Sequence, residues 1–263
     1  MALSDLLTAQ DEDTGTIELP ARETPGPVID LREVAKTYRM GTQEVHAVRN
    51  VTLRIGQGEY VAIVGPSGSG KSTLMNILGC LDILTSGSYR LGGEDVEQLS
   101  ETALARVRNR QIGFVFQQFH LLPTLSAWRN VELPMIYGQV GKGLRRERAE
   151  AALARVGLAD RLDNRPGELS GGQQQRVAVA RALAGDPTMI LADEPTGNLD
   201  SASTDEVLAL FDELHAAGRT IVLITHELDV ARRARRIVFV RDGEITSDQP
   251  TTDEPAGREE VAA

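Results

Sequence analysis

Gly65-Pro66-Ser67-Gly68-Ser69-Gly70-Lys71-Ser72 is the stretch from which the rest of the chain can be interpreted. An apolar, strand-like run at 60–64 precedes it, and an apolar run with helical spacing at 73–78 follows it. The phosphate-loop pattern GxxxxGK(S/T) requires this order of strand, loop and helix. We therefore expect the stretch to bind a nucleoside triphosphate.

The residue types in this loop match the chemistry that it would perform. Glycines at 65, 68 and 70 allow a tight turn that brings backbone N–H groups to phosphate oxygens, and the helix that follows presents its positive N-terminal end. Lys71 would reach the β- and γ-phosphates, and the Ser72 hydroxyl would ligate Mg²⁺. The alternative is a glycine-rich turn that matches the pattern by chance. On its own, the motif predicts only nucleotide binding.

The negative charge of the chain is concentrated at its two ends. The formal net charge is −10 over 263 residues. Residues 1–27 hold six acidic side chains against one arginine, and 242–263 hold seven against one, so the middle of the chain is close to neutral. A neutral middle gives no electrostatic case for nucleic acid as a partner.

Cysteine content and hydropathy limit the compartment. Cys80 is the sole cysteine, which excludes an internal disulfide and is typical of a reducing compartment. No apolar run approaches the roughly 20 residues that span a bilayer, so we expect no direct insertion into a membrane. The arginine-rich stretch 144–156 is more typical of an ordinary amphipathic helix than of a membrane-surface anchor, because Glu147 and Glu150 share its polar face.

Strand-like and helical stretches alternate along the middle of the chain. Strands are expected at 28–34, 45–55, 60–64, 89–91, 112–116, 188–192, 220–225 and 237–240, and helices at 73–78, 100–110, 174–184 and 203–217. Such alternation predicts an α/β fold with a three-layer, mainly parallel sheet. Residues from about 121 to 185 form an expected α-helical insertion. We expect one domain over 28–247, with disordered acidic segments at 1–27 and 248–263.

Polar side chains follow three of the expected strands, and in a parallel sheet such positions meet at one edge. They are Gln117 after 112–116, Asp193 and Glu194 after 188–192, and His226 after 220–225. Asp193 suits a Mg²⁺ ligand and Glu194 could polarise an attacking water, although such a pair can also cap the next segment. Gln117 could sense Mg²⁺ and that water. His226 could hold the γ-phosphate or orient the water, or it could be an ordinary polar residue at a strand end.

Leu169-Ser170-Gly171-Gly172-Gln173 matches the signature of the ATP-binding cassette ATPases, and the chain resembles that family from about Val28 to Ile245. The phosphate loop, Gln117, the signature, the acidic strand end, Asn198-Leu199-Asp200 and His226 follow one another in the family's order. The resemblance implies a P-loop NTPase core that carries an antiparallel β subdomain and an inserted α-helical subdomain. It also implies that Tyr38 stacks on adenine, although position alone favours an ordinary tyrosine of a sheet.

The resemblance implies ATP and Mg²⁺ as ligands and assigns the site residue by residue. The residues implied to contact nucleotide are Tyr38, Gly65, Pro66, Ser67, Gly68, Ser69, Gly70, Lys71, Ser72, Thr73, Ser170, Gly171, Gly172, Gln173 and Asp200. Those implied to hold the metal are Ser72, Gln117 and Asp193, and those implied to act in hydrolysis are Lys71, Gln117, Glu194 and His226. The signature would bind the γ-phosphate held by a second copy of the chain, and Asp200 would link the two sites across that interface.

Within the family, the chain looks most like the macrolide-export and lipoprotein-release type, through residues 41–47, 78–82, 112–119 and 170–176. That likeness implies a homodimeric ATPase that drives a separate integral-membrane permease, as an exporter or a mechanical transmitter. The ATPase would be cytoplasmic and would lie on the inner face of the cell membrane through the permease.

One stretch departs from that group. The chain has Trp128-Arg129-Asn130 where the group often has a glutamate before the asparagine, so the charge of the permease contact would differ. The alternatives to a transporter subunit are a soluble cassette ATPase of DNA repair or translation, and an ATP-dependent switch that acts on a non-transport partner. The sequence does not encode the transported substrate, the direction of transport or the identity of the permease.

Overall fold

The computed structural model describes residues 26–41 and 43–251, and their strands form two sheets. The four-stranded sheet has the order β2-β1-β4-β5, from β1 (Ile29–Met40), β2 (Gln43–Ile55), β4 (Ser86–Leu91) and β5 (Glu94–Asp95). The six-stranded sheet has the order β10-β9-β3-β8-β7-β6, from β3 (Tyr60–Val64), β6 (Ile112–Phe116), β7 (Met189–Asp193), β8 (Thr220–Thr225), β9 (Arg236–Arg241) and β10 (Glu244–Pro250).

The direction of the strands confirms the predicted sheet class. Neighbours in the six-stranded sheet run parallel except β10, which is antiparallel to β9, and the pairs of the four-stranded sheet are all antiparallel. Strand β10 was not predicted, because it lacks an apolar run. It extends past 248, where we expected the tail to begin, and two hydrogen bonds of 2.7 Å from Arg236 hold Asp248 there. The rest of both expected disordered segments, 1–25 and 252–263, lies outside the described residues.

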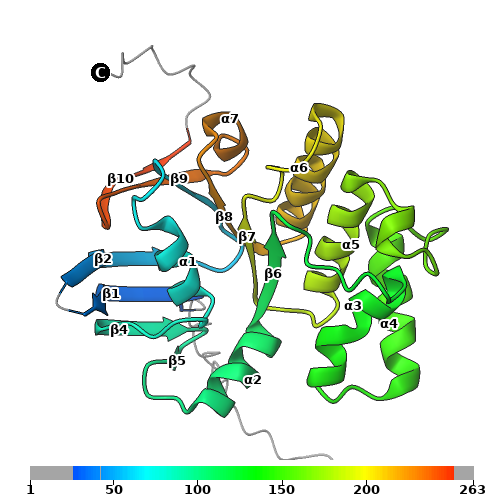
Figure 1. Cartoon of the computed structure of the whole chain (residues 1–263), viewed down its shortest axis with the longest axis horizontal. Coiled ribbons are helices and arrows are strands. Elements are labelled where there is room, and N and C mark those ends of the chain that lie inside the picture. The colour runs from blue at the N-terminus through cyan, green and yellow to red at the C-terminus, as the bar shows by residue number, and fades with distance from the viewer. Residues whose placement is uncertain (1–25, 42, 252–263) are drawn as a thin grey trace, which may run out of the picture.

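The helices divide between the two sides of the larger sheet. They are α1 (Lys71–Leu78), α2 (Glu101–Gln111), α3 (Ala127–Tyr137), α4 (Lys142–Arg155), α5 (Gly171–Leu183), α6 (Ser201–Ala216) and α7 (Leu228–Ala231), with a short 3-10 helix at Pro166–Glu168. Figure 1 shows α3, α4 and α5 gathered on one side of the molecule and the antiparallel sheet on the other. The predicted helical insertion is therefore present.

Alternation of side chains along the central strands builds two cores. In β3, Tyr60, Ala62 and Val64 belong to the core that contains the apolar faces of α3 to α6. Val61 and Ile63 belong to the core that contains α1 and the antiparallel sheet. Successive side chains of a strand point to opposite faces, so a sheet that is covered on both faces has apolar residues at every position. This is why the parallel strands are continuous apolar runs in the sequence.

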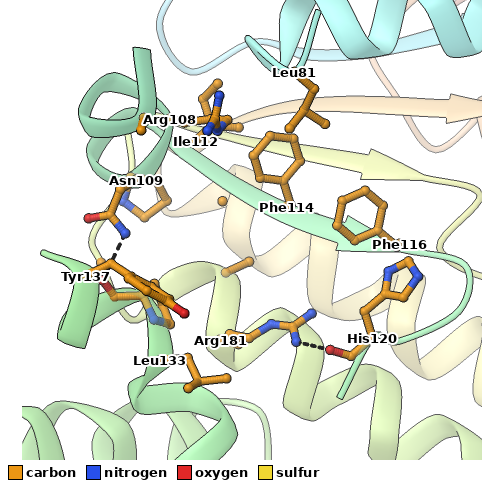
Figure 2. A pocket seen from close by; sticks show the side chains of 16 residues that line it. Leu81, Arg108, Asn109, Ile112, Phe114, Phe116, His120, Leu133, Tyr137 and Arg181 are labelled. Atoms are coloured by element: carbon orange, nitrogen blue, oxygen red, sulfur yellow. Dashed lines mark hydrogen bonds between the residues drawn. The ribbon is translucent and has the colours of Figure 1, made fainter. Parts of the chain in front are cut away.

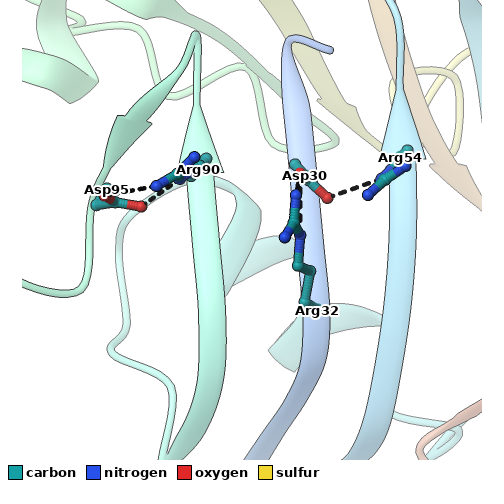
Figure 3. Close-up of polar contacts among 5 residues, drawn as sticks. All are labelled: Asp30, Arg32, Arg54, Arg90 and Asp95. Atoms are coloured by element: carbon teal, nitrogen blue, oxygen red, sulfur yellow. Dashed lines mark hydrogen bonds and ion pairs between the residues drawn. The ribbon is translucent and has the colours of Figure 1, made fainter. Parts of the chain in front are cut away.

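A row of charges crosses the antiparallel sheet (Figure 3). Asp30 on β1 lies opposite Arg54 on β2 and Arg90 on β4, and Arg90 lies opposite Asp95 on β5. Asp30 is buried and accepts hydrogen bonds from Arg32 at 2.7 Å and Arg54 at 3.1 Å, and the first of these leads the interactions that lower its pKa. A slip of one residue would separate these pairs, so the row helps to fix the register of β1.

Candidate functional site

The phosphate loop joins the end of β3 to the start of α1, and its glycines are required by close contacts. A Cβ at Gly65 would collide with the carbonyl oxygen of Val240, and a Cβ at Gly70 would collide with that of Ala47. Gly68 and Gly70 have φ values of +79° and +98°, which other residues rarely adopt. Segments distant in the sequence, from β9 and β2, therefore hold the loop in shape.

Lys71 and the start of α1 make this loop a positively charged cradle. The Lys71 ammonium donates hydrogen bonds to the carbonyl oxygens of Gly65 at 2.5 Å and Pro66 at 2.9 Å, so it lies across the loop. No acidic residue occupies the first turn of α1 to offset the positive end of the helix. Among the described residues, the buried Ser69 hydroxyl finds no hydrogen-bond partner. These features fit an anion at the loop.

A cavity of about 640 Å³ opens beside the phosphate loop. Its lining includes Ser67, Gly68, Gly70, Lys71, Ser72 and Thr73 from the loop, and Gln117, Asp193, Glu194 and His226 from the strand ends. The structure therefore brings the loop together with all four polar side chains that we predicted at this edge of the sheet. The volume lies within the range of small-molecule and cofactor sites. We call this hollow the nucleotide cavity.

Sequence reasoning missed part of the lining. The missed residues are Val45, His46, Ala47 and Arg49 from β2, Ile224 from β8, and Asp242 and Gly243 from the turn between β9 and β10. Backbone hydrogen bonds bring this turn to the loop, because the Gly243 N–H donates to the Ser69 carbonyl oxygen at 2.9 Å. The sequence marked a strand at 45–55 and a turn at 242–243, but no local pattern shows that either reaches the loop.

Glu194 follows β7 and is held by the end of the neighbouring strand, β8. Its Oε1 lies 2.8 Å from His226 Nδ1, and its Oε2 accepts a hydrogen bond from the Thr225 hydroxyl at 3.2 Å. Its N–H donates to the carbonyl oxygen of Ile224 at 2.8 Å, and its φ of +45° is uncommon for a residue with a side chain. Backbone outliers of this kind are typical of functional sites. The carboxylate is thereby fixed beside the end of β8.

The electrostatics of the cavity favour a cation near Asp193. Burial first, and then the charge of Glu194, raise the pKa of Asp193, while Lys71 acts in the opposite direction. The hydrogen bond and charge of Glu194 raise the pKa of His226, which favours its imidazolium form. Ser72, Gln117 and Asp193 offer hydroxyl, amide and carboxylate oxygens on the same cavity, and these are ligands that Mg²⁺ accepts. The predicted metal ligands therefore suit the ion in chemistry.

Gln117 and Asn198 join two of the predicted segments. Gln117 Nε2 donates to Asn198 Oδ1 at 3.3 Å, and Asn198 Nδ2 donates to the Gln117 carbonyl oxygen at 3.0 Å. Asp200, two residues on, caps α6 by accepting a hydrogen bond from the Ser203 N–H at 2.9 Å. The hydrogen bonds from Ser203 lower the pKa of Asp200. In the single chain, Asp200 is thus a helix cap.

The signature residues lie outside the nucleotide cavity. Ser170 caps α5, and its side chain and that of Gln173 each accept a hydrogen bond from the other's N–H, at 3.3 and 2.9 Å. This cap starts α5 at Gly171, three residues before the predicted start. A Cβ at Gly172 would lie 2.7 Å from the Ser203 hydroxyl, so glycine allows α5 to approach α6. None of these residues lines the cavity around the loop.

Tyr38 lies beside the nucleotide cavity without lining it. Its cross-strand partner, Val45, does line the cavity. The Tyr38 hydroxyl donates a hydrogen bond to Asp82 Oδ2 at 2.6 Å. The structure therefore places the predicted stacking residue next to the site, with its hydroxyl bonded elsewhere.

A second, apolar cavity of about 560 Å³ lies among α2, β6, α3 and α5 (Figure 2). Figure 2 shows Leu81 and Phe114 on one side of it and Leu133 and Tyr137 on the other. Leu81 and Tyr137 are 49% and 78% exposed, so large apolar groups meet solvent along this cavity. We call this cavity the α2–α3 groove. Trp128 and Arg129 do not line it; they line a separate hollow with α4, where Arg129 and Arg146 lie 5.0 and 4.7 Å from the Trp128 ring.

A phosphate loop, acidic strand ends and a signature helix on one α/β sheet define an ATP-binding cassette. The family model described as "ABC transporter" matches residues 48–197, and the chain belongs to this family as an ATP-binding protein. Among the helices of the described residues, none combines the length and apolar character needed to cross a membrane.

The relatives differ in how much of their length the chain covers. The chain is 56% identical over 222 residues to the uncharacterized ABC transporter ATP-binding protein YvrO of Bacillus subtilis, covering 84% of this chain and 97% of that one. It is 55% identical over 229 residues to the macrolide export ATP-binding/permease protein MacB of Bordetella avium, covering 87% of this chain but 35% of MacB. A dimeric, post-hydrolysis structure of the ATP-binding cassette MJ0796 with ADP and Pi matches at 44% identity and a TM-score of 0.78, over 86% of this chain and 100% of that one.

Proposed function

We propose that the chain binds ATP with Mg²⁺ in the nucleotide cavity, hydrolyses it to ADP and phosphate, and thereby drives a separate membrane permease. The observation that carries the proposal is the convergence of the phosphate loop, Gln117, Asp193, Glu194 and His226 on one cavity. Membership of a family whose ATPases hydrolyse ATP supports it.

Each side chain has a role that its position supports. Lys71 and the N–H groups of the loop bind the β- and γ-phosphates. Glu194 orients a water molecule for in-line attack on the γ-phosphate, and His226 holds the Glu194 carboxylate in place through the 2.8 Å contact. Mg²⁺, held by Ser72, Gln117 and Asp193, would supply positive charge to the phosphate oxygens. Tyr38 stacks on the adenine from the rim of the cavity.

We propose a homodimer because one chain leaves the nucleotide cavity without its signature. Ser170 is exposed at the start of α5, whose N–H groups and positive helix end suit a γ-phosphate. A second copy, packed head to tail, would present these groups to the cavity of the first. The dimeric structure of the MJ0796 cassette supports this arrangement.

We propose that the α2–α3 groove receives the permease. The groove is apolar and open, and its lining includes exposed side chains that a soluble monomer does not need to expose. The MacB relative, whose name joins ATP-binding and permease functions in one chain, supports a permease partner. Its name also favours export as the direction of transport. The hollow that Trp128 and Arg129 line with α4 is separate from this groove.

One experiment tests the whole proposal. We would tag the Glu194→Gln variant, measure phosphate release and ATP-dependent dimerisation, and identify proteins that copurify from membranes extracted in mild detergent with ATP. We expect phosphate release to fall by at least a hundredfold, because the base is lost while ATP binding remains. We also expect a dimer with ATP, and a stoichiometric integral-membrane protein.

The matched control is Glu213→Gln, which changes an exposed carboxylate of α6 that does not line the cavity. Its phosphate release should equal that of the wild type. Normal turnover in Glu194→Gln would remove Glu194 from its role. Copurification of ribosomes, nucleic acid or nothing would leave an ATPase that does not drive a permease.

A further inference from the structure

Tyr38 belongs to a small polar cluster that links the antiparallel sheet to the end of the phosphate-loop helix. Its hydroxyl donates to Asp82 Oδ2 at 2.6 Å, and the Lys36 ammonium donates to Asp82 Oδ1 at 2.5 Å. Lys36 also donates to the carbonyl oxygen of Ile83 at 2.6 Å. The Lys36 and Asp82 side chains are only 12% and 27% exposed, so solvent screens this pair less than a surface pair.

Asp82 is fixed relative to the phosphate loop through α1. The N–H groups of Leu81 and Asp82 donate to the carbonyl oxygen of Asn76, at 2.8 and 3.2 Å, just beyond the end of α1. The other end of α1 begins at Lys71, in the phosphate loop. A helix of eight residues is a short, stiff element. Through α1 and Asp82, the position of the Tyr38 side chain is therefore coupled to that of the phosphate loop, although Tyr38 lies 44 residues before Asp82 in the chain.

The Tyr38 ring is held on one face and placed at the rim of the nucleotide cavity. Lys36 lies two residues before Tyr38 on β1, and its ammonium lies over the ring, 4.9 Å from the centroid. Thr73, which lines the cavity, is close enough for its hydroxyl to act on the Tyr38 pKa. Val45, opposite Tyr38 on β2, also lines the cavity. Because the cation occupies one face of the ring, a nucleotide base would stack on the opposite face.

The protonation states suit a permanent hydrogen bond between these groups. Burial first, and then the hydrogen bond to Asp82, raise the pKa of Tyr38, so the hydroxyl keeps its proton near neutral pH. Burial acts to raise the pKa of Asp82, but hydrogen bonds from Lys36 and Tyr38 outweigh it, and the net pKa is lowered. An ionised acceptor makes a stronger hydrogen bond than a neutral one.

We propose that Asp82 is a positioning residue for nucleotide binding. Its carboxylate, paired with Lys36, fixes the Tyr38 ring at the distance from the phosphate loop at which the purine base of a bound nucleotide lies. This inference rests on the proposed function, because it deepens the account of the same site. Asp82 itself does not contact the nucleotide. It acts only through Tyr38, and only on the base end of the ligand.

The test compares a ligand that has a base with one that has only phosphates. Wild type, Tyr38→Phe, Asp82→Ala and the double variant are titrated with the Mg²⁺ complexes of AMP-PNP and of tripolyphosphate by calorimetry. Each single variant should weaken AMP-PNP binding about threefold to tenfold, as the loss of one hydrogen bond predicts. Tripolyphosphate binding should stay within about twofold of the wild type. The double variant should bind AMP-PNP no more weakly than the weaker single variant.

Asp95→Ala is the matched control, because it removes a carboxylate that is ion-paired with Arg90 (Figure 3) on β5, two strands away from β1 in the same sheet. It should leave both ligands unaffected. The positioning role would be overturned if Asp82→Ala weakened the binding of both ligands equally or of neither. It would also be overturned if the losses of AMP-PNP affinity in Asp82→Ala and Tyr38→Phe multiplied in the double variant. If Asp82→Ala does not fold, Tyr38→Phe still tests the hydrogen bond to Asp82, because it removes the donor. Its affinities for AMP-PNP and tripolyphosphate are then compared in the same way. A wild type that binds neither ligand would remove the proposed function and the inference together.

Discussion

The nucleotide cavity and the α2–α3 groove meet at the end of strand β6 but are built from different kinds of contact. Phe114 and Phe116 line the groove, and Gln117, the next residue, lines the cavity. The cavity is lined mainly by backbone groups and polar side chains, whereas the groove is lined mainly by aromatic and aliphatic ones. The surface proposed for docking and the surface proposed for chemistry thus meet between two consecutive residues, so a movement at the end of β6 would displace residues of both.

A buried amide joins these two regions to the signature helix. Gln175 on α5 is fully buried, and its Nε2 donates to the carbonyl oxygens of Phe116 at 3.3 Å and Pro195 at 2.5 Å. Phe116 belongs to the groove, and Pro195 follows Glu194. Gln175 therefore connects the helical region both to the groove and to the segment that follows Glu194. The two regions thus differ in the chemistry of their side chains, although hydrogen bonds link their backbones.

The largest effect on ligand binding is expected from Lys71→Ala, which disrupts the cavity and leaves the groove intact. Removal of a charged donor to the phosphates should weaken binding of AMP-PNP with Mg²⁺ by at least about tenfold. The measurement is a calorimetric titration. Lys142→Ala, which removes an exposed ammonium from the hollow beside Trp128, should bind as the wild type does. Unchanged affinity in Lys71→Ala would contradict the assignment of the loop.

The nucleotide cavity and the α2–α3 groove also differ in how far the sequence could predict them. The phosphate loop, the parallel sheet and the convergence of Gln117, Asp193, Glu194 and His226 follow from local motifs and from one rule of sheet geometry, and the structure has them all. Local capping signals placed helix starts within a few residues. The assigned roles of the cavity side chains, and of the signature residues toward a second copy, stay predictions.

Other parts depend on contacts between distant segments and left no local signal. The approach of Ala47 and Gly243 to the loop, the bond from Tyr38 to Asp82, and the whole α2–α3 groove are of this kind. The groove in particular needs apolar residues from four separate elements, each of which looks like ordinary core in the sequence. Strand β10 was missed because neither alternation nor an apolar run marks it.

A smaller effect is expected from Leu133→Glu, which breaks the groove and leaves the cavity intact. A carboxylate in place of this apolar side chain should reduce copurification of the proposed permease by about tenfold, because the charge must lose its water when a partner covers the groove. AMP-PNP affinity should remain that of the wild type, since Leu133 does not line the cavity. The readout is the ratio of permease to tagged chain after detergent extraction.

Ile136→Glu is the matched control on the same helix. Ile136 is 41% exposed and lies outside the groove, so the substitution adds the same charge to α3 without entering the apolar surface. Copurification should stay near the wild-type ratio. Equal losses in both variants would mean that added charge on α3, and not the groove, sets the interaction.

The smallest effect concerns pH, to which the Glu194–His226 pair of the cavity should respond. Glu194 raises the pKa of His226 above its ordinary value of 6.5, so the pair stabilises the fold fully below about that pH. This stability is lost as the pH rises through the folded pKa. The His226 side chain is 62% exposed, which limits the gain to that of a surface pair.

Thermal unfolding of the nucleotide-free protein at pH 6 and pH 8 would measure this difference. The melting temperature of the wild type should exceed that of His226→Gln by no more than about 3 °C at pH 6, and by less at pH 8. Leu133→Ala should lower the melting temperature by the same amount at both values, because it removes only apolar contact from the groove. A wild-type advantage over His226→Gln that grows with pH would show that the neutral imidazole, and not its charged form, makes the favourable contact with Glu194. An equal advantage at both pH values would show that protonation of this pair does not affect stability in this range.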